Sequence, residues 1–180
     1  ELRRLMLLDL RGFPRIECVR DVFVFCCFTG LAFIDIKTLR RSDISTDADG
    51  KMWIRKAREK TSEMSIIPML EIPVKIMEKY RDHPTVVTRG VVLPVMTNQK
   101  ANAYLKELAD LAKIQKHLTT HIARHTFATM SLNNHVPLET ISKMLGHSDI
   151  TTTQIYAKML DKTISEDMET MRNKFNGMSF

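Results

Sequence analysis

The spacing of apolar residues along the chain predicts a mainly helical protein. Apolar side chains recur every three or four residues in most segments, which is typical of helices with one face in a core. Gly12, Gly30 and Pro137 interrupt the pattern where helices should stop or start. The expected helices cover residues 1–9, 16–28, 32–40, 71–81, 99–114, 119–133, 137–146, 149–156 and 161–174.

The period changes between residues 43 and 68. Asp49-Gly50 is a turn signal, and apolar and polar residues alternate after it. We expect strands at 43–46, 51–58 and 64–68, and an irregular segment at 84–95. The predicted fold class is therefore mainly α with a small three-stranded antiparallel sheet.

Length and charge narrow the class of protein. A chain of 180 residues is long enough for one domain with a substantial core, so we expect a single domain over residues 1–180. The net charge is +6 and the sequence pI is near 9.3, which favours a polyanionic partner such as nucleic acid. The chain starts at Glu1, already in helical pattern, so we expect a fragment of a longer protein.

The three cysteines, Cys18, Cys26 and Cys27, all lie in an apolar stretch. Their odd number and close spacing predict buried free thiols in a reducing compartment, and their spacing does not suit a zinc site. The apolar run 22–36 is too short to span a bilayer, and no secretory signal precedes it. We therefore expect a cytoplasmic protein.

Candidate chemistry is concentrated between Thr120 and Tyr156. His121 and Arg124 are three residues apart and share a helical face. Taken alone, such a pair indicates only a solvated charge on a capped helix. His121 and His125 have the spacing of a metal-binding pair, but the glutamate of a metalloprotease and a clear third ligand are missing, so we predict no metal. His125 is expected to be structural.

Two further groups follow in order. Leu145-Gly146-His147 places an imidazole just after a glycine helix stop, and Tyr156 follows within Tyr-Ala-Lys. Each alone would be a cap residue or a core aromatic. Together, His-x-x-Arg, Gly-His and Tyr in this order and spacing form a combination that rarely arises by chance.

These residues resemble the tyrosine recombinases, also called phage-type integrases. His121 to Ala128 looks like the second box of that family, and Leu145-Gly146-His147 with Tyr156 looks like its closing motif. Thr29-Gly30-Leu31 resembles the start of the first box, and Lys60-Thr61 the hairpin lysine. The resemblance implies the tyrosine recombinase catalytic-domain fold, no cofactor, and a catalytic set made of Tyr156, Arg124, His121, His147 and Lys60.

The chain departs from the family at one position. An arginine usually follows Thr-Gly-Leu, and here that place holds Ala32, although Asp35 fits the acidic residue three positions later. Arg20 is our candidate substitute, because a guanidinium within an apolar helix face needs an anion. A structural carboxylate could equally be its partner. In this departure the chain resembles integrases of bacterial conjugative transposons and related mobile elements.

The resemblance also implies an activity and partners. Tyr156 would attack a phosphodiester of double-stranded DNA and form a 3′-phosphotyrosyl link, with four protomers acting on two DNA sites. An N-terminal DNA-binding part would be absent from this chain, and the helix at 161–174 would either be exchanged with a neighbour or pack on its own domain. The protein would act in the bacterial cytoplasm, on the nucleoid.

Three alternatives stay open on the sequence. A type IB topoisomerase uses similar chemistry, although the short distance from Gly-His to Tyr favours a recombinase. Ala32 could instead mark a catalytically impaired DNA-binding module. The least specific alternative is a basic helical domain without any of this chemistry.

Overall fold

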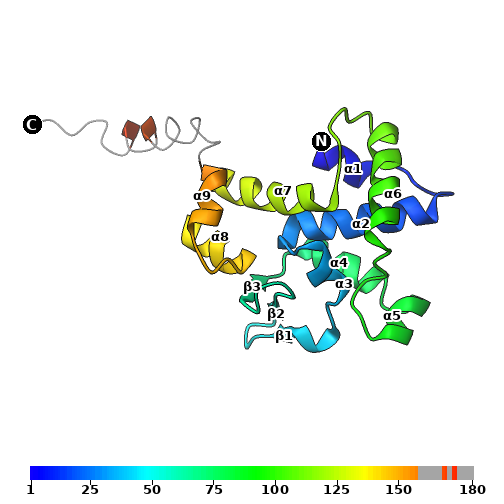
Figure 1. Cartoon of the computed structure of the whole chain (residues 1–180), viewed down its shortest axis with the longest axis horizontal. Coiled ribbons are helices and arrows are strands. Elements are labelled where there is room, and N and C mark those ends of the chain that lie inside the picture. Colours follow the sequence, from blue (N-terminus) through cyan, green and yellow to red (C-terminus); the bar gives the residue numbers. More distant parts are fainter. Residues whose placement is uncertain (158–167, 170–171, 174–180) are drawn as a thin grey trace, which may run out of the picture.

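The computed structural model describes residues 1–157, 168–169 and 172–173. In that part, helices surround a long central helix and a small sheet lies to one side (Figure 1). The predicted fold class is confirmed. The elements are α1 (Leu2–Leu7), α2 (Pro14–Thr29), α3 (Phe33–Lys37), the short 3-10 helix η1 (Arg41–Asp43), β1 (Ile44–Thr46), β2 (Met52–Ala57), β3 (Met64–Pro68), α4 (Glu71–Lys79), α5 (Pro84–Arg89), α6 (Asn98–Leu111), α7 (Thr120–Asn133), α8 (Leu138–Leu145) and α9 (Thr151–Ala157).

Helix α2 is the centre of the core. Pro14 starts it at a position where a missing N–H costs nothing, and Gly30 ends it in a left-handed conformation with φ 68°. Its side chains are apolar on nearly every side, so it must be covered all round. Helices α1, α4, α6 and α7 do this, and α7 lies along α2 (Figure 1).

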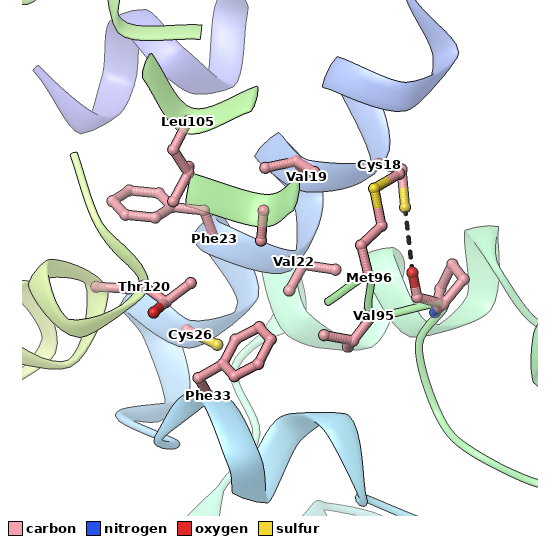
Figure 2. Close-up of a pocket in the computed structure, with 13 residues that line it drawn as sticks. Cys18, Val19, Val22, Phe23, Cys26, Phe33, Val95, Met96, Leu105 and Thr120 are labelled. Atoms are coloured by element: carbon pink, nitrogen blue, oxygen red, sulfur yellow. Dashed lines mark hydrogen bonds between the residues drawn. The ribbon is translucent and has the colours of Figure 1, made fainter. Parts of the chain in front are cut away.

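Figure 2 shows the part of the core around Cys18 and Phe23 of α2. Cys18 of α2 directs its thiol to the carbonyl oxygen of Pro94, at 3.6 Å, around an apolar cavity of only about 20 Å³. Cys18, Cys26 and Cys27 are buried and unpaired, as the sequence predicted. Burial raises the pKa of Cys26 to about 12, so this thiol is inert.

The sheet is antiparallel in the order β1-β2-β3. Ile54 of β2 pairs with Ile67 of β3, and both are buried because alternate residues face the core. Helix α8 packs against β3. This contact brings the β2–β3 hairpin next to the end of α8, and it decides the composition of the site described below.

The structure differs from the sequence prediction at residues 84–95. Residues 84–95 were expected to be irregular, and this is wrong for α5. His83 caps that helix by accepting from the Thr85 N–H, and Gly90 ends it with φ 65°. This helix could not be predicted from the sequence, because its apolar residues show no helical period. Most of the helix predicted at 161–174 lies outside the described residues.

Among the described residues, no helix is long and apolar enough to cross a membrane.

Candidate active site

Arg124 joins the ends of two helices. It lies in α7 and is 4% exposed. Its Nη1 donates to the carbonyl oxygen of Gly30 and its Nη2 to that of Leu145, both at 2.6 Å. These carbonyls belong to the last turns of α2 and α8, where backbone oxygens lack helical partners and carry partial negative charge. The guanidinium is therefore held rigidly by backbone.

Glycine is needed at both helix ends. A Cβ on Gly30 would come within 2.5 Å of the Phe127 ring, and Gly30 has φ 68°. Gly146, with φ 60°, leaves room for Arg58 and Ser65, each 2.7 Å from the place of a Cβ. The glycines thus end the helices and also let side chains approach the backbone closely.

The contact between Arg124 and His147 fixes a tautomer. Nη2 of Arg124 lies 3.0 Å from Nε2 of His147, and Nδ1 of His147 lies 2.7 Å from the Thr153 hydroxyl. A guanidinium can only donate, so Nε2 accepts and Nδ1 carries the proton. Burial, with the charges of Arg124 and Arg58, lowers the pKa of His147 to about 4. His147 is neutral in the free protein.

A second guanidinium reaches the same place. Arg58, at the start of the β2–β3 loop, donates from Nη1 to the carbonyl oxygen of Gly146 at 2.9 Å. Its Nε is 3.8 Å from Asp35 Oδ2 and is buried without a hydrogen-bond partner among the described residues, as is Ser65 Oγ. Burial lowers the pKa of Arg124 to about 10, and the charge of Arg58 acts in the same direction. The sequence pattern placed residue 58 at the end of the expected strand 51–58 and gave it no role.

Asp35 holds the loop that carries Arg58. It is 1% exposed, and its Oδ1 accepts from the Glu59 N–H at 2.9 Å. The hairpin is closed by the Arg58 N–H, which donates to the Glu63 carbonyl. A single carboxylate therefore faces two guanidiniums, so positive charge remains in excess where α2, α8 and the hairpin meet.

Tyr156 lies on α9 beside the histidines of α7. Its ring is 5.2 Å from the His125 ring, edge to face, and the His125 ring is 4.3 Å from that of His121. Tyr156 is 4% exposed. Burial raises its pKa, and the positive charge of Arg124 opposes that rise. The structure therefore brings together four of the residues predicted from the sequence, Arg124, His147, Tyr156 and His121, with His125 between the last two.

Lys60, the remaining residue of the predicted catalytic set, lies on the β2–β3 hairpin. It is exposed in the turn between β2 and β3, two residues after Arg58. Its ammonium is therefore open to solvent.

The suggestion that Arg20 replaces the missing arginine is corrected by the structure. Arg20 donates to Asp21 at 2.8 Å and to the Leu8 carbonyl oxygen at 2.9 Å, and it pairs with Glu17. It lies ten residues before Gly30, about 15 Å along α2. Asp21 is itself buried and also binds Lys79 and Tyr80. The anionic partners of Arg20 are therefore structural carboxylates, which was the alternative interpretation of the sequence.

The described residues contain no group of three His, Cys, Asp or Glu side chains that could hold a metal ion.

Comparison with known proteins identifies the arrangement. Residues 14–163 match the phage integrase family. The chain belongs to that family. Among curated members, it is 33% identical over 141 residues to tyrosine recombinase XerD of Halalkalibacterium halodurans, covering 71% of this chain and 45% of that protein. It is 31% identical over 150 residues to XerD of Yersinia pestis, covering 77% and 48%. The chain thus spans about half the length of these relatives.

Solved structures of integrase-family proteins share the fold. The XerA recombinase is 26% identical with a TM-score of 0.68, covering 99% of this chain and 64% of XerA. XerH bound to palindromic difH substrate is 17% identical with a TM-score of 0.71, covering 93% and 49%. The Tn1549 transposon integrase in complex with circular intermediate DNA is 19% identical with a TM-score of 0.64, covering 94% and 64%. At these identities, the last two comparisons show the fold alone.

Proposed function

We propose that the protein is a site-specific recombinase that cuts and rejoins double-stranded DNA through a covalent link between Tyr156 and a 3′ phosphate. The observation that carries the proposal is the meeting of Arg124, Arg58 and His147 at two helix ends, next to a buried phenol. Cations held rigidly by backbone carbonyls suit a reaction that gathers negative charge on phosphate oxygens.

The reaction exchanges one phosphate ester for another. The Tyr156 oxygen forms a bond to phosphorus while the bond from phosphorus to the 5′ oxygen breaks, which frees a 5′-hydroxyl. A 5′-hydroxyl from a partner strand then attacks the link, so the bond energy is kept and no nucleotide cofactor is required. The phenol must lose its proton and the leaving oxygen must gain one.

Each side chain has a task in this scheme. Arg124 binds phosphate oxygens with its planar fork, and its charge already favours the ionised phenol. Lys60, on the solvent side of the hairpin, protonates the leaving 5′ oxygen. His125 lies against Tyr156 and His121 lies against His125, so these two imidazoles can pass on its proton in turn.

Arg58 supplies the guanidinium that Ala32 does not. Its Nε is buried without a hydrogen-bond partner in the described part of the chain, and its Nη1 binds the Leu145–Gly146 turn that Arg124 also binds. The positive charges of Arg58 and Arg124 repel each other at this turn. A phosphate bound between them would offset that repulsion. Arg58 enters from the hairpin, whereas the family's usual arginine would follow Leu31.

His147 changes its hydrogen bonding when phosphate binds. In the free protein, its Nε2 accepts from Arg124. To donate to a phosphate oxygen, Nε2 must gain a proton, and the anion favours this because it offsets the two guanidinium charges that lower the pKa of His147.

The assembly and setting are part of the proposal. We expect several protomers on two DNA sites, in the bacterial cytoplasm, where the buried free thiols stay reduced. The structure of lambda integrase on a COC′ core site, which is a dimer, shares the fold with a TM-score of 0.60.

The test is covalent trapping. A nicked duplex carrying the protein's recombination site loses the fragment bearing the 5′-hydroxyl after cleavage, so the link accumulates. The protein should form an adduct that survives denaturation, and Tyr156→Phe should form none while still binding the duplex. An adduct in Tyr156→Phe would show that another residue is the nucleophile. A protein that binds DNA without forming any adduct would be the impaired DNA-binding module.

A further inference from the structure

A hollow of about 570 Å³ lies away from the site, between the start of α2, α3, α5 and the start of α6. Its charged lining is entirely basic, with Arg15, Lys37, Arg89 and Lys100 around it and His83 at its edge. No Asp or Glu is among the lining residues. Cys18, Val95 and Met96, which are drawn in Figure 2, form part of its inner wall.

The four cations of this hollow are free to bind an anion. Among the described residues, the side chains of Arg15, Lys37, Arg89 and Lys100 make no hydrogen bond or ion pair. Cations elsewhere on the surface do pair, for example Lys75 with Glu71, and Lys116 with Glu1. Like charges that converge on one concave surface raise its positive potential and attract a polyanion.

Shared helices and hydrogen bonds connect the hollow to the active site on two sides. Lys37 shares the short helix α3 with Asp35, which holds the Arg58 loop. On the other side, Thr120 at the start of α7 donates to Asn98 and Asn102 of α6, the helix that carries Lys100. An anion fixed in the hollow is therefore held at a set position relative to Arg58 and to the helix that carries Arg124.

We propose that this hollow binds the sugar–phosphate backbone of duplex DNA away from the phosphate that is cut, and so sets the position of the duplex over Tyr156. The nature of the partner rests on the proposed function. A duplex carries about one negative charge per 1.7 Å of its axis, so one groove edge offers several phosphates to the four cations at once. The side chains are long, and those of Arg15, Arg89 and Lys100 are exposed, as suits contacts with backbone rather than with bases.

The test compares two pairs of neutralising substitutions with the same change in net charge. Arg89→Gln with Lys100→Gln removes two cations of the hollow. Arg3→Gln with Lys106→Gln removes two exposed cations outside it, and Lys106 is on the same helix as Lys100. Binding of the protein to a random-sequence duplex is measured between about 50 and 200 mM salt.

Log affinity falls as log salt rises, and this fall should be less steep in the hollow variant. The magnitude of the slope should decrease by about 0.9 per lost contact, or about 1.8 in all. The control should leave that slope near the wild-type value. Equal slopes in the two variants would overturn the proposal. If Arg89→Gln weakens α5, Arg15→Gln with Lys100→Gln gives the same comparison. At saturating DNA, adduct formation should persist in the hollow variant, which separates this outcome from failure of the proposed chemistry.

Discussion

Nη2 of Arg124 lies 3.0 Å from Nε2 of His147, and this contact defines the resting state of the site. The imidazole accepts from a guanidinium that is itself bound to two helix ends, so it is neutral and its proton is on Nδ1, facing Thr153. In the proposed reaction, a substrate phosphate would compete for both groups at once. In the free protein, the two side chains proposed to bind phosphate are therefore bound to each other.

The low pKa of His147 makes stability depend on pH. The folded protein binds a proton at His147 only below about pH 4, whereas an unfolded histidine does so below about 6.5. Between these values the unfolded chain binds more protons, so the free energy of unfolding should fall as pH is lowered from about 6.5 to about 4. Above that window this contribution is constant. Urea unfolding across the pH range measures it.

His147→Asn should flatten that dependence. His117→Asn, at an exposed histidine, is the matched control and should leave it unchanged. If His147→Asn keeps the full wild-type slope between pH 4 and 6.5, the low pKa is not a property of this residue.

Arg58 is expected to matter for cleavage and Arg20 is not. Loss of one preorganised donor costs about 10² to 10³ in rate, so Arg58→Gln should slow adduct formation by that factor at saturating DNA. Arg20→Gln should keep the wild-type rate in its folded fraction, because Asp21 retains Lys79 and Tyr80 as partners. Thermal melting reports the folded fraction of each variant.

A modified substrate separates phosphate binding from a purely structural role of Arg58. A methylphosphonate at the cut position lacks one anionic oxygen, so the loss of a guanidinium should cost less there. An Arg58→Gln defect of the same size on both substrates would mean that Arg58 only supports the Gly146 turn.

Lys60 is predicted to act as the general acid, and its role can be isolated chemically. Lys60→Ala should slow cleavage of ordinary DNA by about 10² to 10⁴, the usual contribution of a positioned acid. A substrate with sulfur in place of the 5′ bridging oxygen leaves as a thiolate, which needs no proton because thiols ionise near pH 8.5. The variant should then recover most of its rate. Persistent slowness on the sulfur substrate would assign Lys60 to binding instead.

The sequence predicted the parts of the site that are local. His121 and Arg124 share a helix turn, and the Gly146 stop places His147 directly after α8. Such features depend on helix period and glycine conformation, which are written in adjacent residues. The α2 and α7 helices and all three strands were expected for the same reason.

The role of Arg58 could not be predicted from local pattern. Its partner, Gly146, is 88 residues away in sequence, and their contact depends on the packing of α8 against β3. Arg20 shows the opposite difficulty. The pattern correctly required an anionic partner for Arg20, but it could not distinguish a substrate phosphate from the neighbouring Asp21 and Glu17. Only the observed geometry selects between them.

Mapping the covalent bond tests the central claim most directly. The trapped complex is digested with a protease and a nuclease, and the peptide that retains nucleotide is fragmented in a mass spectrometer. The account predicts a 3′-phosphate ester on Tyr156 and on no other residue of that peptide. Attachment to a nearby hydroxyl, such as Ser148 or Thr153, or attachment through a 5′ phosphate, would contradict it.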